Sequence, residues 1–186
     1  TRHENKTQLV TIMLKHWNTL LNTDCLVVDV GPATVYPIYR VGFTSLVYDT
    51  TCFYYNENIS KCADINVLVR DPAERFISGV NEVCRQNKLD VFNTWNLIAK
   101  DQFIDRHFTP QYLWLMHLYR FYKGNVKLRP FSHIKKLTKI HERKGEQKIS
   151  VPLLQKFIDV DYRLLDMVGR TINLGTLIKR LGNVLS

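Results

Sequence analysis

Two segments of the sequence combine cations, hydroxyl groups and a turn residue in the way that phosphate binding requires. The first runs from Arg40 through Gly42 to Ser45 and supplies a guanidinium, a flexible glycine and two hydroxyls. The second places Arg70 directly after an apolar run and Ser78 eight residues later. Each segment is a predicted strand-to-helix junction, where unpaired backbone N–H groups and the positive end of the helix dipole attract anions. The sequence therefore predicts two anion-binding junctions.

The hydrophobic pattern predicts the elements that position these residues. β-rich runs predict strands and helical spacing predicts helices, with strands at 25–30, 35–39, 65–69 and 125–128, and helices at 7–21, 72–86, 111–122, 151–157 and 172–185. Asp71 and Pro72 mark the start of one helix, and Thr44 and Ser45 are good N-cap residues for another. Alternating strands and helices predict an α/β fold, a three-layer sandwich with a mostly parallel central sheet flanked by helices. Residues 1–186 show no linker or repeat, so we expect a single domain.

Composition limits the classes of protein. With 26 Lys and Arg against 17 Asp and Glu, the formal net charge is +9, and 45% of the residues are hydrophobic, which excludes a disordered chain. The apolar runs fall short of the roughly 20 residues of a membrane span, so none is expected. Four cysteines without C-x-x-C or companion His spacing predict no metal site. Reduced thiols are favoured over a Cys52–Cys62 disulfide.

Nucleotide-binding motifs of the common types are absent from the sequence. Neither G-x-x-x-x-G-K-[ST] nor G-x-G-x-x-G occurs, so kinases, NTPases and dinucleotide enzymes lose their main support. The Arg70–Ser78 segment instead resembles the 3′-phosphate motif of sulfotransferases that use the donor 3′-phosphoadenosine 5′-phosphosulfate (PAPS). The segment after Pro37 resembles the 5′-phosphosulfate loop of that family, usually Pro-Lys-x-Gly-Ser-Thr-Ser-Leu. His107–Gln111 is similar to the His-aromatic-x-Pro stretch of the carbohydrate (Golgi-type) sulfotransferases.

This resemblance implies a P-loop-like sulfotransferase fold and transfer of a sulfuryl group from PAPS to a hydroxyl of a polar acceptor, with a saccharide expected. PAPS would be the co-substrate and the desulfated nucleotide PAP the product. By the resemblance, Arg70 and Ser78 grip the 3′-phosphate, and the 5′-phosphosulfate loop comprises Arg40, Val41, Gly42, Phe43, Thr44 and Ser45. Acceptor choice would depend on the predicted loops 49–64 and 88–106.

Two residues depart from the family pattern: Arg40 stands where the family normally has Lys, and Phe43 where it has a small hydroxyl residue. Arg40 would lie in the catalytic machinery. Its planar guanidinium can bind the 5′-phosphate, but it adjusts to the movement of a leaving oxygen less readily than a Lys ammonium does. The sequence thus leaves open a protein that binds PAP or PAPS without turnover.

A hydroxyl acceptor needs a general base, and His107 is the first candidate, because it lies in the family-like stretch and histidine titrates near neutral pH. A histidine that only orients the following helix is the alternative. Glu57, Glu82 and His117 are weaker candidates. We expect Glu82 to be a solvated helix-surface carboxylate and His117 to be a core histidine. Arg75 is expected to be structural.

The +9 charge and 21 aromatic residues also fit a different class, a basic nucleic-acid or polyanion-binding module. The basic segment 135–148 supports that alternative, and within it Arg143–Gly145 resembles a 3′-phosphate loop of cytosolic sulfotransferases. No DNA- or RNA-binding motif appears, so no specific nucleic-acid partner is expected. The chain as given favours the cytoplasm, whereas removal of an N-terminal anchor would imply a lumenal protein.

Overall fold

A computed structural model describes residues 19–21, 23–100, 102–131 and 155–184. The helix predicted over 7–21, the first half of the helix predicted over 151–157 and the basic segment that includes Arg143–Gly145 therefore lie wholly or mostly outside the described residues. None of the helices in the described ranges combines the length and apolar character that crossing a membrane requires.

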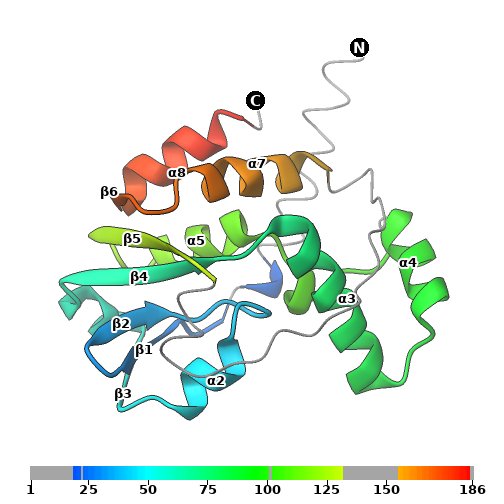
Figure 1. The fold of residues 1–186 in the computed structure, drawn as a ribbon, viewed down its shortest axis with the longest axis horizontal. Helices are drawn as coiled ribbons and strands as arrows, with labels where there is room; N and C mark the ends of the chain where they lie inside the picture. The colour runs from blue at the N-terminus through cyan, green and yellow to red at the C-terminus, as the bar shows by residue number, and fades with distance from the viewer. Residues whose placement is uncertain (1–18, 22, 101, 132–154, 185–186) are drawn as a thin grey trace.

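The centre of the protein is one six-stranded sheet in the order β3-β1-β2-β4-β5-β6 (Figure 1). Its strands are β1 (Leu26–Val30), β2 (Ala33–Tyr36), β3 (Cys52–Tyr55), β4 (Asp64–Val69), β5 (Asn125–Pro130) and β6 (Thr171–Asn173). β4 is parallel to β2 and to β5, whereas the other three pairings are antiparallel. The fold is therefore α/β with a mixed sheet, and the prediction of a mostly parallel sheet holds only at its centre. For β1 and β2 the reason is local, because only two residues lie between them, one of them Gly31 at φ 59°, and so short a connection joins only antiparallel strands.

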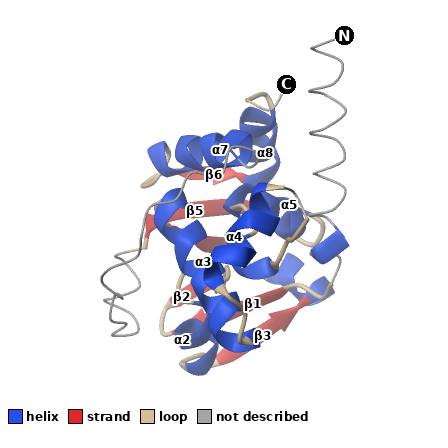
Figure 2. Ribbon diagram, turned by 90° about the vertical axis from the view of Figure 1, so that its right-hand side faces the viewer, coloured by secondary structure: helices blue, strands red, loops and turns tan. Residues whose placement is uncertain are grey.

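The helices pack around this sheet and against one another. They are α2 (Phe43–Tyr48), α3 (Pro72–Asn87), α4 (Val91–Ala99), α5 (Gln111–Tyr119), α7 (Gln155–Asp166) and α8 (Leu174–Gly182), with short 3₁₀ helices η1 (Asn56–Lys61) and η2 (Arg106–Phe108). Figure 2 shows α3, α4 and α5 in front of the strands, with α7 and α8 close to β5 and β6. α7 contacts α3, α5 and α8.

The central strand β4 and the helix that follows it form as the sequence predicts. Ile65, Val67, Leu68 and Val69 are each at most 2% exposed, as expected for a strand covered on both faces. The α3 helix then begins at Pro72 and ends at Asn87, and the next residue has the left-handed conformation that commonly terminates helices.

Other boundaries differ from the prediction. The N-cap of α2 is Gly42 at φ 73°, so Thr44 and Ser45 lie inside the first turn and neither caps the helix. The predicted loop 49–64 contains β3 and η1, and the predicted loop 88–106 contains α4. The predicted helix 172–185 begins only at Leu174, because β6 pairs with β5 and the Asn173 side chain caps α8.

Candidate functional site

The candidate site lies at the carboxyl ends of β2 and β4. These strands are parallel neighbours, so their carboxyl ends meet at the same edge of the sheet. The chain leaves β2 through α2 toward β3 on one side, and leaves β4 through α3 toward β5 on the other (Figure 1). Such a topological switch point is where open α/β sheets bind ligands. Because the two predicted anion-binding junctions follow these two strands, the topology makes them neighbours.

Side-chain contacts join the two junctions directly. Arg70 Nη1 donates a hydrogen bond of 3.0 Å to the carbonyl oxygen of Arg40. Arg40 Nε in turn donates one of 2.7 Å to Ser78 Oγ, and Ser78 is only 1% exposed. Arg40 has a φ of 64°, a left-handed conformation that non-glycine residues seldom adopt. The structure thus brings together Arg40, Arg70 and Ser78, which the motif resemblance assigns to one ligand.

Arg75 adds a third guanidinium and is structural, as predicted. It is 2% exposed, its Nε donates to the carbonyl of Tyr39 at 3.0 Å, and its Nη1 donates to the carbonyl of Thr109. Burial, opposed by Asp161 and reinforced by the neighbouring arginine charges, lowers the pKa of Arg75 to about 10, so it stays charged at neutral pH. The carbonyls of two successive residues, 39 and 40, are therefore each held by an arginine.

The three guanidiniums form what we call the arginine cluster: Arg40, Arg70 and Arg75. Besides burial, the charges of Arg70 and Arg40 both lower the pKa of Arg75, and an anion placed among the three cations would relieve that repulsion. The start of α3 contributes less than the sequence suggested, because the Asp71 carboxylate already accepts from the N–H of Glu74 at 3.0 Å. The positive charge at this junction therefore comes mainly from the arginine cluster.

Glu82, one turn beyond Ser78 on α3, corrects the expectation of a solvated carboxylate. It is 7% exposed, accepts hydrogen bonds from Arg85 and Gln86, and lies 3.8 Å from Arg40 Nη1. The bonds from Arg85, against the opposing effect of burial, lower the pKa of Glu82 to about 2. A carboxylate with so low a pKa is a poor proton acceptor, which disfavours Glu82 as a general base.

His107 is half-buried in η2 and paired with a carboxylate. Its Nδ1 lies 2.6 Å from Asp105 Oδ1, and the same oxygen accepts from the His107 backbone N–H at 2.8 Å. Burial of Asp105 raises its pKa, but the bonds from His107 outweigh that effect and the net pKa is lowered, so Asp105 is a carboxylate at neutral pH. With Nδ1–H directed at Asp105, the basic nitrogen of the ring is Nε2. This arrangement suits a general base.

Two contacts place His107 beside the junctions. A Cβ on Gly79 of α3 would lie 2.1 Å from the His107 carbonyl oxygen, so only glycine lets α3 approach η2 so closely. The ring of Tyr39 lies 5.1 Å from the His107 ring and 4.5 Å from that of Phe43. Tyr39 therefore connects His107 to the loop that carries Arg40.

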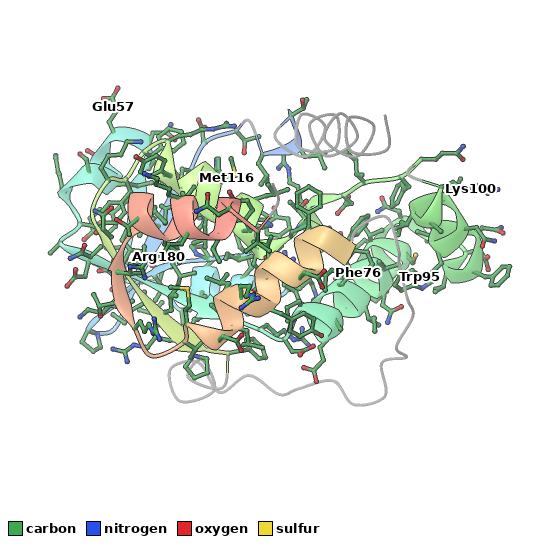
Figure 3. The ribbon with its side chains drawn as sticks, turned by 90° about the horizontal axis from the view of Figure 1, so that it is seen from above. Glu57, Phe76, Trp95, Lys100, Met116 and Arg180 are labelled. Atoms are coloured by element: carbon green, nitrogen blue, oxygen red, sulfur yellow. The ribbon has the colours of Figure 1, made fainter. Side chains whose placement is uncertain are left out.

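The remaining candidates for the general base are Glu57 and His117. Glu57 is exposed in η1 and projects outward, far from Phe76 and Trp95, which pack together between α3 and α4 (Figure 3). His117 is a core histidine, as predicted: it is 4% exposed and hydrogen-bonds the Tyr36 hydroxyl and the carbonyl of Thr23. Burial lowers its pKa.

Sequence reasoning missed three polar residues around the site. Asp105 had a weak local signal, an acid two residues before a histidine. Gln111 ends the family-like stretch His107–Gln111, but nothing in the sequence indicated its contact with Arg70, and Asp161 had no signal. Both residues are buried and hydrogen-bond residues 41 to 50 positions away in the chain.

Within the described ranges, no three His, Cys, Asp or Glu side chains are arranged to hold a metal ion. All four cysteines are free, as expected from the reduced interpretation, and Cys25 is buried, which raises its pKa to about 12.

Comparisons of the chain with protein-family models, curated proteins and solved structures found no match. Function is therefore inferred from the geometry of the site itself.

Proposed function

We propose that the protein binds PAPS at the β2/β4 switch point and transfers its sulfuryl group to a hydroxyl of a polar acceptor, with a saccharide as the acceptor class. The proposal includes the P-loop-like, three-layer sulfotransferase fold that the motifs imply. The observation that carries it is the contact chain from Arg70 to the Arg40 carbonyl and from Arg40 to Ser78. Residues that the motifs assign to the two phosphates of one nucleotide are adjacent in space.

The residues divide between binding and chemistry. Arg70 and Ser78 would hold the 3′-phosphate. The 5′-phosphosulfate would lie against Arg40 and the backbone N–H groups of residues 42–45, because the first N–H groups of α2 have no partner inside that helix. The Val41 N–H is not among them, since it donates to the Ile38 carbonyl at 3.1 Å. Arg40 would balance the charge that develops on the leaving phosphate.

His107 would take the proton of the acceptor hydroxyl at Nε2 while Asp105 stabilises the imidazolium. The acceptor oxygen then forms a bond to sulfur as the bond between sulfur and the bridging oxygen breaks. PAP leaves with the electron pair of that bond, and the proton remains on His107 until solvent removes it.

A second candidate function is nucleotide binding without turnover. Its support is the position of Arg40, which donates to Ser78 and lies 3.8 Å from Glu82. A guanidinium held on two sides is less able than a Lys ammonium to follow a leaving oxygen. This candidate shares the nucleotide site with the first and differs from it only in rate.

The test of the shared site is titration calorimetry with PAP. We expect Arg70→Ala to weaken PAP binding by at least about 10-fold, since a hydrogen-bonded charge pair contributes about 1.5–3 kcal/mol. The matched control is Arg180→Ala, which removes an exposed arginine on α8 (Figure 3). Unchanged PAP affinity in a folded Arg70→Ala variant would refute the assignment.

A further inference from the structure

Gln111, the first residue of α5, hydrogen-bonds both the backbone N–H and the backbone carbonyl of Arg70. Its Oε1 accepts from the Arg70 N–H at 3.0 Å, and its Nε2 donates to the Arg70 carbonyl oxygen at 2.9 Å. The Gln111 residue is 0% exposed. One side-chain amide thus gives Arg70 the two hydrogen bonds that a neighbouring strand residue would give.

Arg70 needs this support because it lies just beyond the sheet. The last pair between β4 and β5 is Val69 with Pro130, and the N–H of Phe131 bonds to the Val69 carbonyl. Arg70 is followed at once by Asp71, the N-cap of α3. Its peptide groups therefore belong neither to the strand ladder nor to the helix, and partly buried peptide groups require partners.

Gln111 is itself fixed by a carboxylate from another helix. Asp161 of α7 is 3% exposed and accepts from the backbone N–H of Gln111 at 2.8 Å and of Tyr112 at 2.9 Å. These are the first N–H groups of α5, whose N-cap residue, Pro110, offers no side-chain cap. Asp161 therefore caps α5 from a distance and holds Gln111 in place.

The side chain of Arg70 is held at two further points, which depend on where its backbone lies. The guanidinium lies 5.1 Å from the centre of the Phe131 ring and donates to the Arg40 carbonyl. A shift of the Arg70 backbone by even about 1 Å would displace the guanidinium from the position that a bound phosphate requires.

We propose that Gln111 is a positioning residue for recognition of the 3′-phosphate: it sets the backbone of Arg70, and Asp161 of α7 fixes Gln111. This inference rests on the proposed function, because it assumes that the ligand of Arg70 is a 3′-phosphate. It adds that selection of the nucleotide depends on contacts from α5 and α7, which lie outside both phosphate motifs.

The test compares the affinities of PAP and 5′-AMP, which lacks the 3′-phosphate, by titration calorimetry on the full chain. Gln111→Met keeps the side-chain volume and removes both hydrogen bonds. Gln111→Glu keeps the acceptor and replaces the donor. The control is Thr94→Val, which removes a buried hydrogen bond on α4 to the Asp90 carbonyl and leaves Arg70 untouched.

We expect the wild-type chain to prefer PAP, and each Gln111 variant to lose about 10-fold in PAP affinity with less than about a 2-fold change for 5′-AMP. Thr94→Val should keep the wild-type ratio. If the wild type does not discriminate the two nucleotides, the proposed function fails and this inference with it. If the wild type discriminates and the folded Gln111 variants keep its ratio, or Thr94→Val loses it equally, only the positioning role is refuted.

Discussion

Arg40 has two roles to reconcile at the scale of single residues. In the proposed function it takes the place of the lysine that the motif resemblance leads us to expect. Its side chain donates to Ser78 and lies near Glu82, and its own carbonyl accepts from Arg70. Its backbone contacts would serve any residue at position 40. Only the side-chain contacts depend on the guanidinium, so we expect a change of side chain at position 40 to affect turnover more than nucleotide binding.

Replacing Arg40 by lysine tests this separation. We expect Arg40→Lys to raise the rate of PAP release from PAPS in the presence of mixed saccharide acceptors, with less than about a 2-fold change in PAP affinity, because an ammonium can move with the leaving oxygen. The two quantities are measured by product assay and by calorimetry on the same preparation. Tighter PAP binding at an unchanged rate would contradict the role given to Arg40.

At the scale of elements, the site depends on how closely α3 approaches η2. That approach is set by Gly79, where an added Cβ would lie 2.1 Å from the carbonyl oxygen of His107. Neither element can yield easily, since α3 also carries Ser78 and Arg75, and both residues are buried.

Gly79→Ala should therefore destabilise the protein by about 1–3 kcal/mol, the usual cost of overpacking, and lower any His107-dependent rate. Urea unfolding measures the first effect. Gly175→Ala on α8 is the control, because its nearest neighbour at 3.1 Å is the hydroxyl of a flexible side chain, Tyr119. Equal stability losses in the two variants would show that the α3–η2 approach is not tight.

Asp161 of α7, which accepts hydrogen bonds from the start of α5, makes the stability of the protein depend on pH. Burial, opposed by the backbone bonds from Tyr112 and Gln111, raises the pKa of Asp161 to about 6 from an ordinary 3.8. The folded state therefore holds a proton that the unfolded state releases between these values. The stability contributed by protonated Asp161 is complete below pH 3.8 and is lost as the pH rises through 6.

Asp161→Asn removes this titration. The difference in free energy of unfolding between wild type and Asp161→Asn should fall by up to about 3 kcal/mol as the pH rises from about 4 to about 6.5. Urea unfolding at a series of pH values measures it. A difference that stays constant across this window would mean that Asp161 has an ordinary pKa.

At the scale of the whole molecule, the sequence predicted those strands and helices whose hydrophobic pattern or capping residues lie within the element itself. The buried run of β4 and the Asp71–Pro72 start of α3 gave both elements with nearly correct bounds. β3 was missed because its residues are mostly exposed, so its conformation depends on pairing with β1 rather than on a buried pattern. β6 has only three residues and depends likewise on β5.

The same distinction applies to the site. The two junctions were predicted separately, and their adjacency follows from the parallel pairing of β2 with β4. The burial of Glu82 and the contacts between Gln111 and Asp161 could not be predicted, because each depends on an element distant in the chain. The pattern of a single sequence does not indicate which distant residues will be in contact.

Recognition of a nucleotide that carries a 3′-phosphate is the central claim, and thermal unfolding with PAP tests it most directly. At 100 times its dissociation constant a ligand stabilises the folded state by about 2.7 kcal/mol, which for a domain of this size raises the unfolding temperature by about 5–10 °C. We expect that rise with PAP and a clearly smaller one with 5′-AMP at the same concentration. An unfolding temperature raised equally by 5′-AMP would contradict the claim. A temperature unchanged by saturating PAP would contradict it and favour the polyanion-binding alternative.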